Sequence, residues 1–505
     1  MKLAILHYHL AAGGVTRVIA NHLRSLDGDA SIEAVLIVSD GNWSGFPDLE
    51  LSFPVSHVAF DGMTYRESAA TSCELADDVQ IALVAAGFGQ DETVLHAHNH
   101  SLGKTTAVAS ALHELLGRGW AVLYQIHDFA EDFRPDGYVR MQEAFGDRFG
   151  EVVYPQRPRA HYATLTVSDH DLLAAAGVTA DRNHRLPNPV LSDGTVADSE
   201  ARTAARQRMV EQLNIRASDS YWVYPVRGIR RKNLGEACLI AAAMQPESVV
   251  IGVTLSPENP KEQPQHQAWT EFARSAGLPI RFGTGDPGQL SFAENLAAAD
   301  AIVTTSISEG FGMVFLEAWL NQRPLVGRDL PDITADFKRA GLDLSMLTAA
   351  RPVPIDWFDH DGLIDRYRSA FRDLQERYRQ PPIADDDFER QFVKPIVQAG
   401  EIDFGRLDET AQQQVIRTVL DDPKAASTVR EQVTIVDDHV LIQRNATVVH
   451  RVFGKEASGR RLLAVYRSVL ESPTEGDPSP IDAGSILTNP ACGKLSLGKF
   501  RLLRT

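Results

Sequence analysis

The feature that most constrains the fold of this chain is a repeated alternation of short apolar segments with helical patterns. The first series of predicted strands comprises residues 3–8, 34–38, 93–97, 121–126 and 164–167. A second series comprises residues 221–226, 249–253, 280–282, 301–305 and 324–327. Strands that alternate with helices favour parallel sheets covered by helices. The pattern therefore predicts an α/β protein with two Rossmann-like domains, each offering ligand sites at the carboxyl ends of its strands.

The domain boundaries are predicted from changes in composition. The sequence Leu-Pro-Asn-Pro at 186–189 breaks the first alternation, and we interpret the polar stretch after it, to about residue 201, as a linker. A later segment is rich in charge, glutamine and helix formers, and is predicted to be a helical insertion. We expect an N-terminal domain at 1–190, completed by helices within 460–505. The C-terminal domain is expected at 191–356 with 423–459, and the insertion at 357–422.

Composition excludes several classes of protein. The chain has 505 residues, 44% hydrophobic and 23% charged, as expected for a globular protein of two or three domains. It has no apolar stretch near 18 residues, and the apolar run at 1–6 is too short for a signal peptide. Its cysteines (Cys73, Cys238 and Cys492) are far apart and form no disulfide framework, so we expect a cytoplasmic protein. The net charge of −17 argues against nucleic acid and an anionic membrane as partners.

The segment 306–319, Ser-Ile-Ser-Glu-Gly-Phe-Gly-Met-Val-Phe-Leu-Glu-Ala-Trp, combines glycines with two glutamates. It follows the predicted strand at 301–305 and runs into a predicted helix. Glu309 therefore lies in a strand-to-helix turn, where glycines allow a ligand to approach the backbone and free amides can face an anion. Glu317 lies about one turn into the helix, within reach of paired hydroxyls. On spacing alone, an acidic turn before an ordinary amphipathic helix explains these residues equally well.

A basic turn follows the first strand of the second series. The sequence Val-Arg-Gly-Ile-Arg-Arg-Lys-Asn at 226–233 places Arg227 and Lys232 beyond the end of this strand. Cations at the end of a parallel strand can neutralise a diphosphate, arginine through its planar fork and lysine as a point charge. A solvated basic turn is the alternative explanation, and two acidic residues in the same half make it less favoured.

Together these motifs resemble the Glu-x7-Glu and Arg-x4-Lys patterns of the retaining glycosyltransferases of family 4, which have the GT-B fold. The resemblance implies two facing Rossmann-like domains with parallel sheets. It implies that Arg227 and Lys232 hold and stabilise the donor diphosphate and that Glu317 holds the nucleotide ribose. Donor-sugar contacts would come from Glu309, Gly310, Phe311 and Gly312. The glycine usual after the lysine is Asn233 here, which also tolerates left-handed backbone geometry.

The same resemblance assigns residues in the N-terminal half. Gly13 and Gly14 match the family's glycine loop near the donor phosphate and the acceptor, with Arg17 beside it. His127, after the predicted strand at 121–126, would line the donor-sugar pocket, and we do not interpret it as a general base. The acceptor would contact His98, Asn99 and Arg17.

A metal site is the competing interpretation. Alternation along a strand would place His96, His98 and His100 on one face, which is metal-ligand spacing. However, no other set of histidines or acids completes a metal shell. The Asp-His-Asp sequence at 169–171 follows Ser168, and a helix N-cap with acids in the first turn explains it. We therefore predict no metal requirement.

The predicted function is transfer of a sugar from a nucleoside-diphosphate sugar to the hydroxyl of a small soluble acceptor, with retention of anomeric configuration. Three alternatives remain: a phosphorylase or synthase-type enzyme of the same fold, a non-catalytic subunit that binds sugar nucleotides, and a metal-dependent hydrolase. The sequence does not specify the base, the sugar, the acceptor or the oligomeric state.

Overall fold

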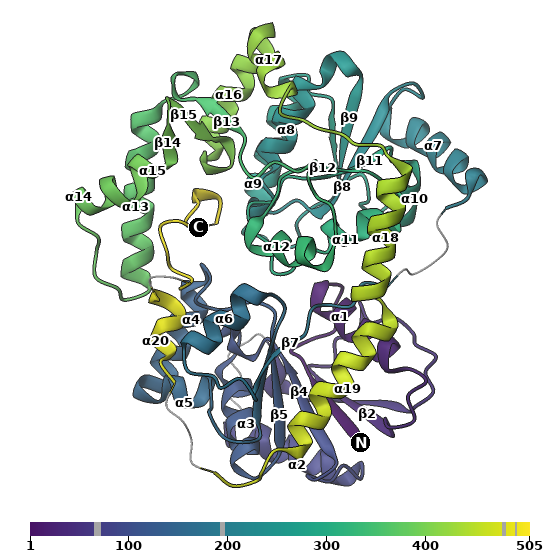
Figure 1. The fold of residues 1–505 in the computed structure, drawn as a ribbon, viewed down its shortest axis with the longest axis vertical. Helices are drawn as coiled ribbons and strands as arrows, with labels where there is room; N and C mark the ends of the chain where they lie inside the picture. The colour runs from purple at the N-terminus through teal and green to yellow at the C-terminus, as the bar shows by residue number, and fades with distance from the viewer. Residues whose placement is uncertain (65–71, 192–196, 477–480, 490–491, 505) are drawn as a thin grey trace. The chain divides into compact units, whose positions relative to one another are not determined.

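The computed structural model describes residues 1–64, 72–191, 197–476, 481–489 and 492–504, so part of the predicted linker, 192–196, lies outside the described residues. The chain divides into two compact units (Figure 1). Unit 1 comprises Met1–Leu191, Glu376–Gln380 and His450–Lys499. Unit 2 comprises Ser192–Gln375, Pro381–Val449 and Phe500–Thr505. This division differs from the predicted domains, because 450–459 belong to unit 1 and 500–505 to unit 2.

Unit 1 is built on a parallel sheet with the strand order β3-β2-β1-β4-β5-β6-β7. Its strands are β1 (Lys2–Leu6), β2 (Ala34–Ser39), β3 (Val55–Ala59), β4 (Thr93–His98), β5 (Ala121–Ile126), β6 (Ala160–Thr164) and β7 (Asn183–Arg185). Its main helices are α1 (Gly14–Leu26), α2 (Ser72–Ala85), α3 (Thr106–Gly117), α4 (Pro135–Phe145), α5 (Phe149–Val153), α6 (Val167–Ala175), α19 (Lys455–Glu471) and α20 (Ala483–Thr488). Parallel strands place all their carboxyl ends at one edge of the sheet, which is where a ligand site is expected.

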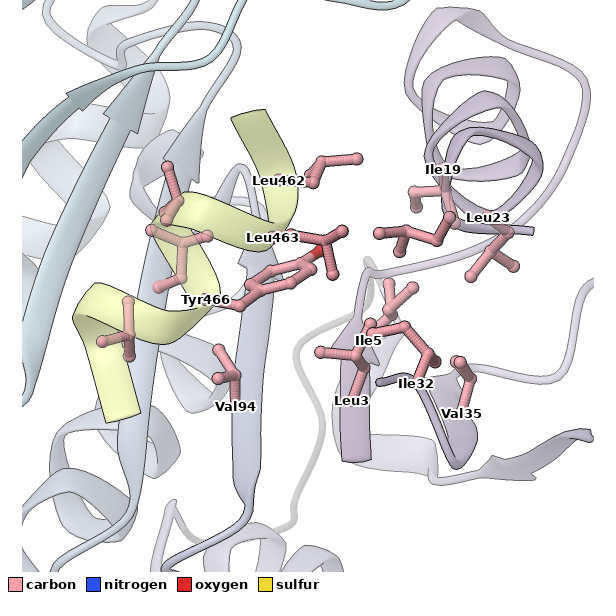
Figure 2. Packing of buried hydrophobic residues seen from close by; sticks show 14 of the residues in the cluster. Leu3, Ile5, Ile19, Leu23, Ile32, Val35, Val94, Leu462, Leu463 and Tyr466 are labelled. Carbon is pink, nitrogen blue, oxygen red and sulfur yellow. The ribbon is translucent and has the colours of Figure 1, made fainter. Parts of the chain in front are cut away.

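The core of unit 1 joins the two ends of the sequence. Helix α19 contributes Leu462, Leu463 and Tyr466, which pack with Leu3 and Val94 of the sheet (Figure 2). These side chains are at most 7% exposed. Residues separated by more than 360 positions in sequence thus share one apolar cluster, and α19 is part of the unit rather than an appendage.

Unit 2 is built on a second parallel sheet, with the order β10-β9-β8-β11-β12. Its strands are β8 (Ser220–Arg227), β9 (Val249–Leu255), β10 (Ile280–Phe282), β11 (Ala301–Thr304) and β12 (Leu325–Gly327). Its helices include α7 (Ser199–Leu213), α8 (Leu234–Ala243), α9 (Gln263–Ser275), α10 (Phe292–Ala298), α11 (Val314–Leu320), α12 (Pro331–Ala340) and α18 (His439–Phe453), whose end lies in unit 1. Because β8 and β11 are neighbours, the turns that follow them are brought together.

The segment predicted as a helical insertion is only partly helical. It contains α13 (His360–Arg377), α14 (Asp385–Phe388), α15 (Lys394–Ile396) and α16 (Glu409–Asp421), followed by α17 (Pro423–Arg430). It also contains β14 (Val397–Gln398) and β15 (Glu401–Asp403), which form a small antiparallel sheet with β13 (Pro352–Pro354). Its tip belongs to unit 1, where the hydroxyl of Tyr378 donates to the carbonyl of Ala130 at 2.8 Å.

Two local predictions in the first half are wrong, and two strands were not predicted. The strand predicted at 164–167 is β6, Ala160–Thr164, and Thr166 instead caps α6 by accepting from the Asp169 amide at 3.1 Å. The predicted cap, Ser168, therefore lies inside the helix. Strands β3 and β7 were not predicted, because edge strands that are polar or exposed lack an apolar pattern.

Among the described helices, none has the length and hydropathy that spanning a membrane requires.

Candidate functional site

The turns after β8 and β11 form a cationic site around one carboxylate. Strand β8 ends at Arg227, and a single 3₁₀ turn, Arg230–Lys232, precedes α8. The ammonium of Lys232 donates to Glu309, which lies in the turn between β11 and α11. Nη1 of Arg231 donates to the other oxygen of Glu309 at 3.1 Å. The structure thus brings together the predicted Lys232 and Glu309.

Arg231 is a member of this site that the sequence reasoning missed. Its Nη1 also donates to the carbonyl of Ser308 at 2.8 Å, so one guanidinium holds both the backbone and the side chain of the second turn. The signal for Arg231 in the sequence is the run of basic residues at 230–232. The Arg-x4-Lys pattern, however, specifies only Arg227 and Lys232. A three-residue 3₁₀ turn directs neighbouring side chains to different sides, which the sequence pattern does not specify.

The ion pair is almost removed from solvent. The side chain of Lys232 is 13% exposed and that of Glu309 is 9% exposed. Burial by itself would raise the pKa of the Glu309 carboxyl, but the charges of Lys232 and Arg231 outweigh it and hold this pKa at about 2. Burial lowers the pKa of the Lys232 ammonium, and the charge of Glu309 opposes that shift. Each member of the pair therefore favours the charged form of the other.

The backbones of the two turns are also joined directly. The hydroxyl of Thr305 donates to the carbonyls of Lys232 and Asn233, at 3.0 and 3.1 Å. The hydroxyl of Tyr224, on β8, donates to the Lys232 carbonyl at 2.9 Å and bonds Ser306 at 2.8 Å. These bonds fix the position of Lys232 relative to the sheet, which is the preorganisation that charge stabilisation requires.

The other predicted donor residues of unit 2 lie on the same two segments as this pair, close to it in sequence. Arg227 forms an ion pair with the largely exposed Glu258 at 2.5 Å. Gly310 is half-buried, and Phe311 is buried against Phe337. Glu317 lies half-buried in the first turn of α11, as the spacing predicted.

Gly312 has a structural requirement for glycine. Its φ is +82°, and a Cβ there would lie 2.6 Å from the ring of Phe315. The turn between β11 and α11 therefore needs glycine at this position, whatever it binds.

In unit 1 the glycine loop lies where the sequence placed it, between β1 and α1. Gly13 is the N-cap of α1, Gly14 is its first residue, and both are exposed. Arg17 is half-buried in the first turn of the helix. Gly45 packs against the loop so closely that a Cβ on it would lie 2.0 Å from the Ala12 amide nitrogen, which limits the paths open to the loop.

His98 and His127 are joined at the ends of β4 and β5. Their Nδ1 and Nε2 atoms lie 2.9 Å apart, and both side chains are buried. Asn99, predicted to contact the acceptor, uses its side-chain oxygen internally, accepting from the amides of His127 and Asp128 at 2.7 and 3.0 Å. Its backbone is left-handed, with φ of +59°. Asn99 is thus a clasp between two strand ends.

The three histidines predicted to share a strand face do not act as a set. His100 lies beyond the end of β4, in a 3₁₀ turn, and bonds the carbonyl of Val153 at 2.8 Å. His22, on α1, takes its place beside His96 and His98, and one ring nitrogen from each of the three lies within 4.8 Å of the others. Both ring nitrogens of His96 are already engaged, with Tyr466 and with Gln125, at 2.9 and 2.8 Å. Coordination by all three would require breaking one of these bonds.

The Asp-His-Asp triplet is divided between two environments. Asp169 is buried and forms an ion pair with Lys494 at 2.5 Å. Asp171 is exposed and bonds the neighbouring His170 at 3.1 Å. The two carboxylates have separate partners, so the triplet is not arranged as a shared metal site in the described structure.

Comparison with known proteins supports a glycosyltransferase-like fold. No family model matches the chain. The chain is 28% identical over 354 residues to the mannosylglucosyl-3-phosphoglycerate synthase of Petrotoga mobilis. The match covers 67% of this chain and 66% of that protein, so it spans slightly less than two thirds of its relative.

Two solved structures resemble the whole chain more closely in fold than in sequence. Anabaena HepE, in complex with UDP and glucose, has a TM-score of 0.53 at 13% identity and covers 93% of this chain and 100% of its own. Sucrose-phosphate synthase from Thermosynechococcus elongatus has a TM-score of 0.53 at 15% identity, with coverages of 93% and 99%. At these identities the likeness shows the fold, which is GT-B-like, with two parallel-sheet units.

We predict that mild acid destabilises the protein through the buried histidines. Burial lowers the pKa of His7 and His96 to about 4 and that of His127 to about 3, from an ordinary 6.5. Below pH 6.5 the unfolded chain binds more protons at these histidines than the folded one does. The free energy of unfolding therefore decreases as the pH is lowered. Each such histidine costs about 2 kcal/mol at pH 5. Burial raises the pKa of Glu131 to about 7, which acts in the opposite direction but for one group only.

Urea unfolding at pH 7, 6 and 5 measures this effect, above the range where ordinary carboxylates titrate. His96→Gln should reduce the pH dependence by about 2 kcal/mol between pH 7 and 5. His57→Gln, at an exposed histidine of the same unit, is the control and should leave it unchanged. A free energy of unfolding that is equal at pH 7 and pH 5 would contradict the prediction.

Proposed function

We propose that this chain is a glycosyltransferase that moves a sugar from a nucleoside-diphosphate sugar to an acceptor hydroxyl. One observation carries the proposal: Arg231 and Lys232 are fixed around Glu309 at the ends of two adjacent parallel strands, in a GT-B-like fold. Ligands of open parallel sheets bind at this edge. The similarity to a synthase named for a glycosylated phosphoglycerate supports the same class of reaction.

The proposed chemistry depends on leaving-group stabilisation. When the bond from the sugar to the diphosphate breaks, negative charge grows on the departing phosphate oxygens. Lys232 lies in the turn that would face this charge, and Arg227 ends the strand before it. Lys232 is held by bonds to its own backbone as well as by Glu309. Preorganised cations in a water-poor site lower the barrier because they need no rearrangement as the charge develops.

Retention and metal independence are parts of the same proposal. In the described structure, no pair of carboxylates arranged as in a retaining glycosidase was identified at this turn, where Glu309 is engaged by two cations. We propose that the leaving phosphate accepts the acceptor's proton on the face from which it departs. The cations of the turn supply the positive charge that a divalent ion would otherwise bring to the diphosphate.

We propose a small anionic acceptor, such as a sugar acid or a sugar phosphate. The curated relative is named for a product of that chemistry, a phosphoglycerate bearing two sugars. Arg17, in the first turn of α1 beside the exposed Gly13 and Gly14, could help to recognise such a charge. The net charge of −17 disfavours an acceptor in an anionic membrane.

A direct assay tests the proposal. The protein is incubated with UDP-, GDP- and ADP-sugars and with sugar acids or sugar phosphates, in EDTA, and the products are identified with their anomeric configuration. We expect transfer with retention that EDTA does not abolish. Turnover that requires inorganic phosphate would indicate a phosphorylase, and nucleotide binding without any turnover would indicate a binding subunit. Activity lost in EDTA and restored by Mg²⁺ or Mn²⁺ would overturn metal independence.

Lys232→Ala is predicted to lower kcat by about 10²–10³-fold, the usual effect of deleting one charge-stabilising donor. The exposed lysine of α15, changed as Lys394→Ala, is the matched control and should retain full activity. Circular dichroism and a melting curve establish that both variants are folded at the assay temperature. Near-normal turnover in folded Lys232→Ala would remove this turn from the mechanism.

Glu317 and Glu309 are predicted to act on different parts of the donor. A hydrogen bond to a charged group contributes roughly 1.5–3 kcal/mol, so Glu317→Ala should weaken binding of the bare nucleoside diphosphate by about 10–100-fold. Glu309→Ala should mainly reduce transfer, since the Lys232 ammonium remains to attract the diphosphate but loses the carboxylate that orients it. Isothermal titration with the nucleotide and initial rates with the sugar nucleotide separate the two. Identical profiles would mean that the division of roles is wrong.

A further inference from the structure

We propose that Gln412 and Glu409, on helix α16, are positioning residues that set the place of Lys232 in the diphosphate-binding turn. This inference rests on the proposed function. It assigns a role to part of the segment 357–422, whose sequence predicted only a helical insertion. Helix α16 instead packs against α8, the helix that the turn leads into.

The first step is the conformation of Asn233, the residue directly after Lys232. Its backbone is left-handed, with φ of +52° and ψ of 59°. Glycine adopts this conformation without cost, whereas asparagine requires local hydrogen bonds to favour it. Asn233 is 1% exposed, so its side-chain amide must find its partners inside the protein.

Those partners come from two helices. Nδ2 of Asn233 donates to Glu236 at 2.8 Å, one turn along α8. Its Oδ1 accepts from Nε2 of Gln412 at 2.8 Å, and Gln412 is fully buried. The approach is very close, because a Cβ on Gly235 would lie 2.0 Å from Oε1 of Gln412. The side chain of Asn233 thus gives α16 a hydrogen-bond partner that glycine would not provide.

Glu409, one turn before Gln412, holds the other end of the same turn. Its two oxygens accept from Nε and Nη2 of Arg230, at 2.6 and 3.0 Å. The side chain of Glu409 is 15% exposed, and that of Arg230 is 30% exposed. Helix α16 therefore grips the residues on both sides of the Arg231–Lys232 pair, which leaves these two cations directed towards Glu309.

A buried set of charges anchors this arrangement. Glu236 accepts from Arg328 at 2.6 and 2.9 Å and from Arg351 at 3.3 Å. Arg328 also donates to Asp403 at 2.8 and 3.0 Å. Glu236 and Asp403 together offset the charges of Arg328 and Arg351, so removal of either carboxylate would leave these buried arginines less well compensated. Arg351 directly precedes β13, and Asp403 is the last residue of β15. These charges therefore connect the small antiparallel sheet to Glu236.

The consequence is a specific effect on chemistry. If α16 no longer fixes Asn233, Lys232 loses one of its supports and is placed less accurately, while its charge and its bonds to Tyr224, Thr305 and Glu309 remain. A displaced cation can still attract a diphosphate in the ground state, but it stabilises the charge that develops in the transition state less well. Loss of the positioning residue should therefore lower kcat more than it raises the KM for the donor.

The test combines Gln412→Ala with Lys232→Ala. We expect Gln412→Ala to lower kcat by about tenfold and to change the donor KM by less than threefold. In the Lys232→Ala background, Gln412→Ala should change kcat by less than twofold, because the residue through which it acts is absent. Gln413→Ala, on the same helix, is the control and should match the wild type. Unchanged kcat in Gln412→Ala, or an equal loss in both backgrounds, would overturn the inference.

Two further variants guard against unfolding and separate the inference from the proposed function. Asn233→Gly keeps the left-handed backbone accessible and removes the side chain that bonds Gln412. It should therefore lower kcat more than it changes KM, and wild-type kinetics would overturn the inference.

Hydrogen exchange needs no substrate. The amides of Lys232 and Asn233, bonded to Ile229 and Arg230 at 2.9 Å, should exchange faster in Gln412→Ala and Glu409→Gln, and unchanged exchange would count against positioning. A wild type that transfers no sugar from any sugar nucleotide would mean instead that the proposed function is wrong.

Discussion

The ion pair between Lys232 and Glu309 is the interaction on which the candidate site depends. It joins the turns after two neighbouring parallel strands, and both side chains are nearly removed from water. A lone ammonium in this place would be costly, and a lone carboxylate would be protonated more readily. Arg231 adds a second cation to the same carboxylate. Groups of the protein itself therefore hold these cations at a strand end.

The surroundings of that pair show how an acidic protein can maintain a local cationic site. The chain carries a net charge of −17, yet charged groups next to the turn form ion pairs with one another. Glu236 and Asp403 form ion pairs with Arg328, and Glu236 also pairs with Arg351. Screening and pairing make the field at the turn a local property, which the total charge does not describe.

Unit 1 uses neutral polar groups for the same purpose of fixing strand ends. His98 bonds His127, and Asn99 holds the backbone of the next strand's exit. His96 links β4 to α19 through Tyr466, so the apolar core in Figure 2 continues directly into a polar cluster. Burial lowers the pKa of each of these three histidines, which keeps the imidazoles neutral. His98, Asn99 and His127, which the sequence predicted to contact ligands, thus also have structural roles at the strand ends.

The sequence by itself determined the two parallel α/β units, most central strands, and the turns that carry Lys232, Glu309 and Glu317, because buried strands and glycine turns leave local patterns. It did not reveal polar edge strands, the antiparallel sheet, the Thr166 cap or Arg231. Nor did it show that His22 replaces His100 beside His96. The Thr166 cap is local and depends on where β6 ends and α6 begins. Only the tertiary structure decided most of the others, since they depend on partners far away in sequence. Asn233 and Gln412, 179 residues apart, meet because α16 packs on α8, and no local pattern encodes that contact.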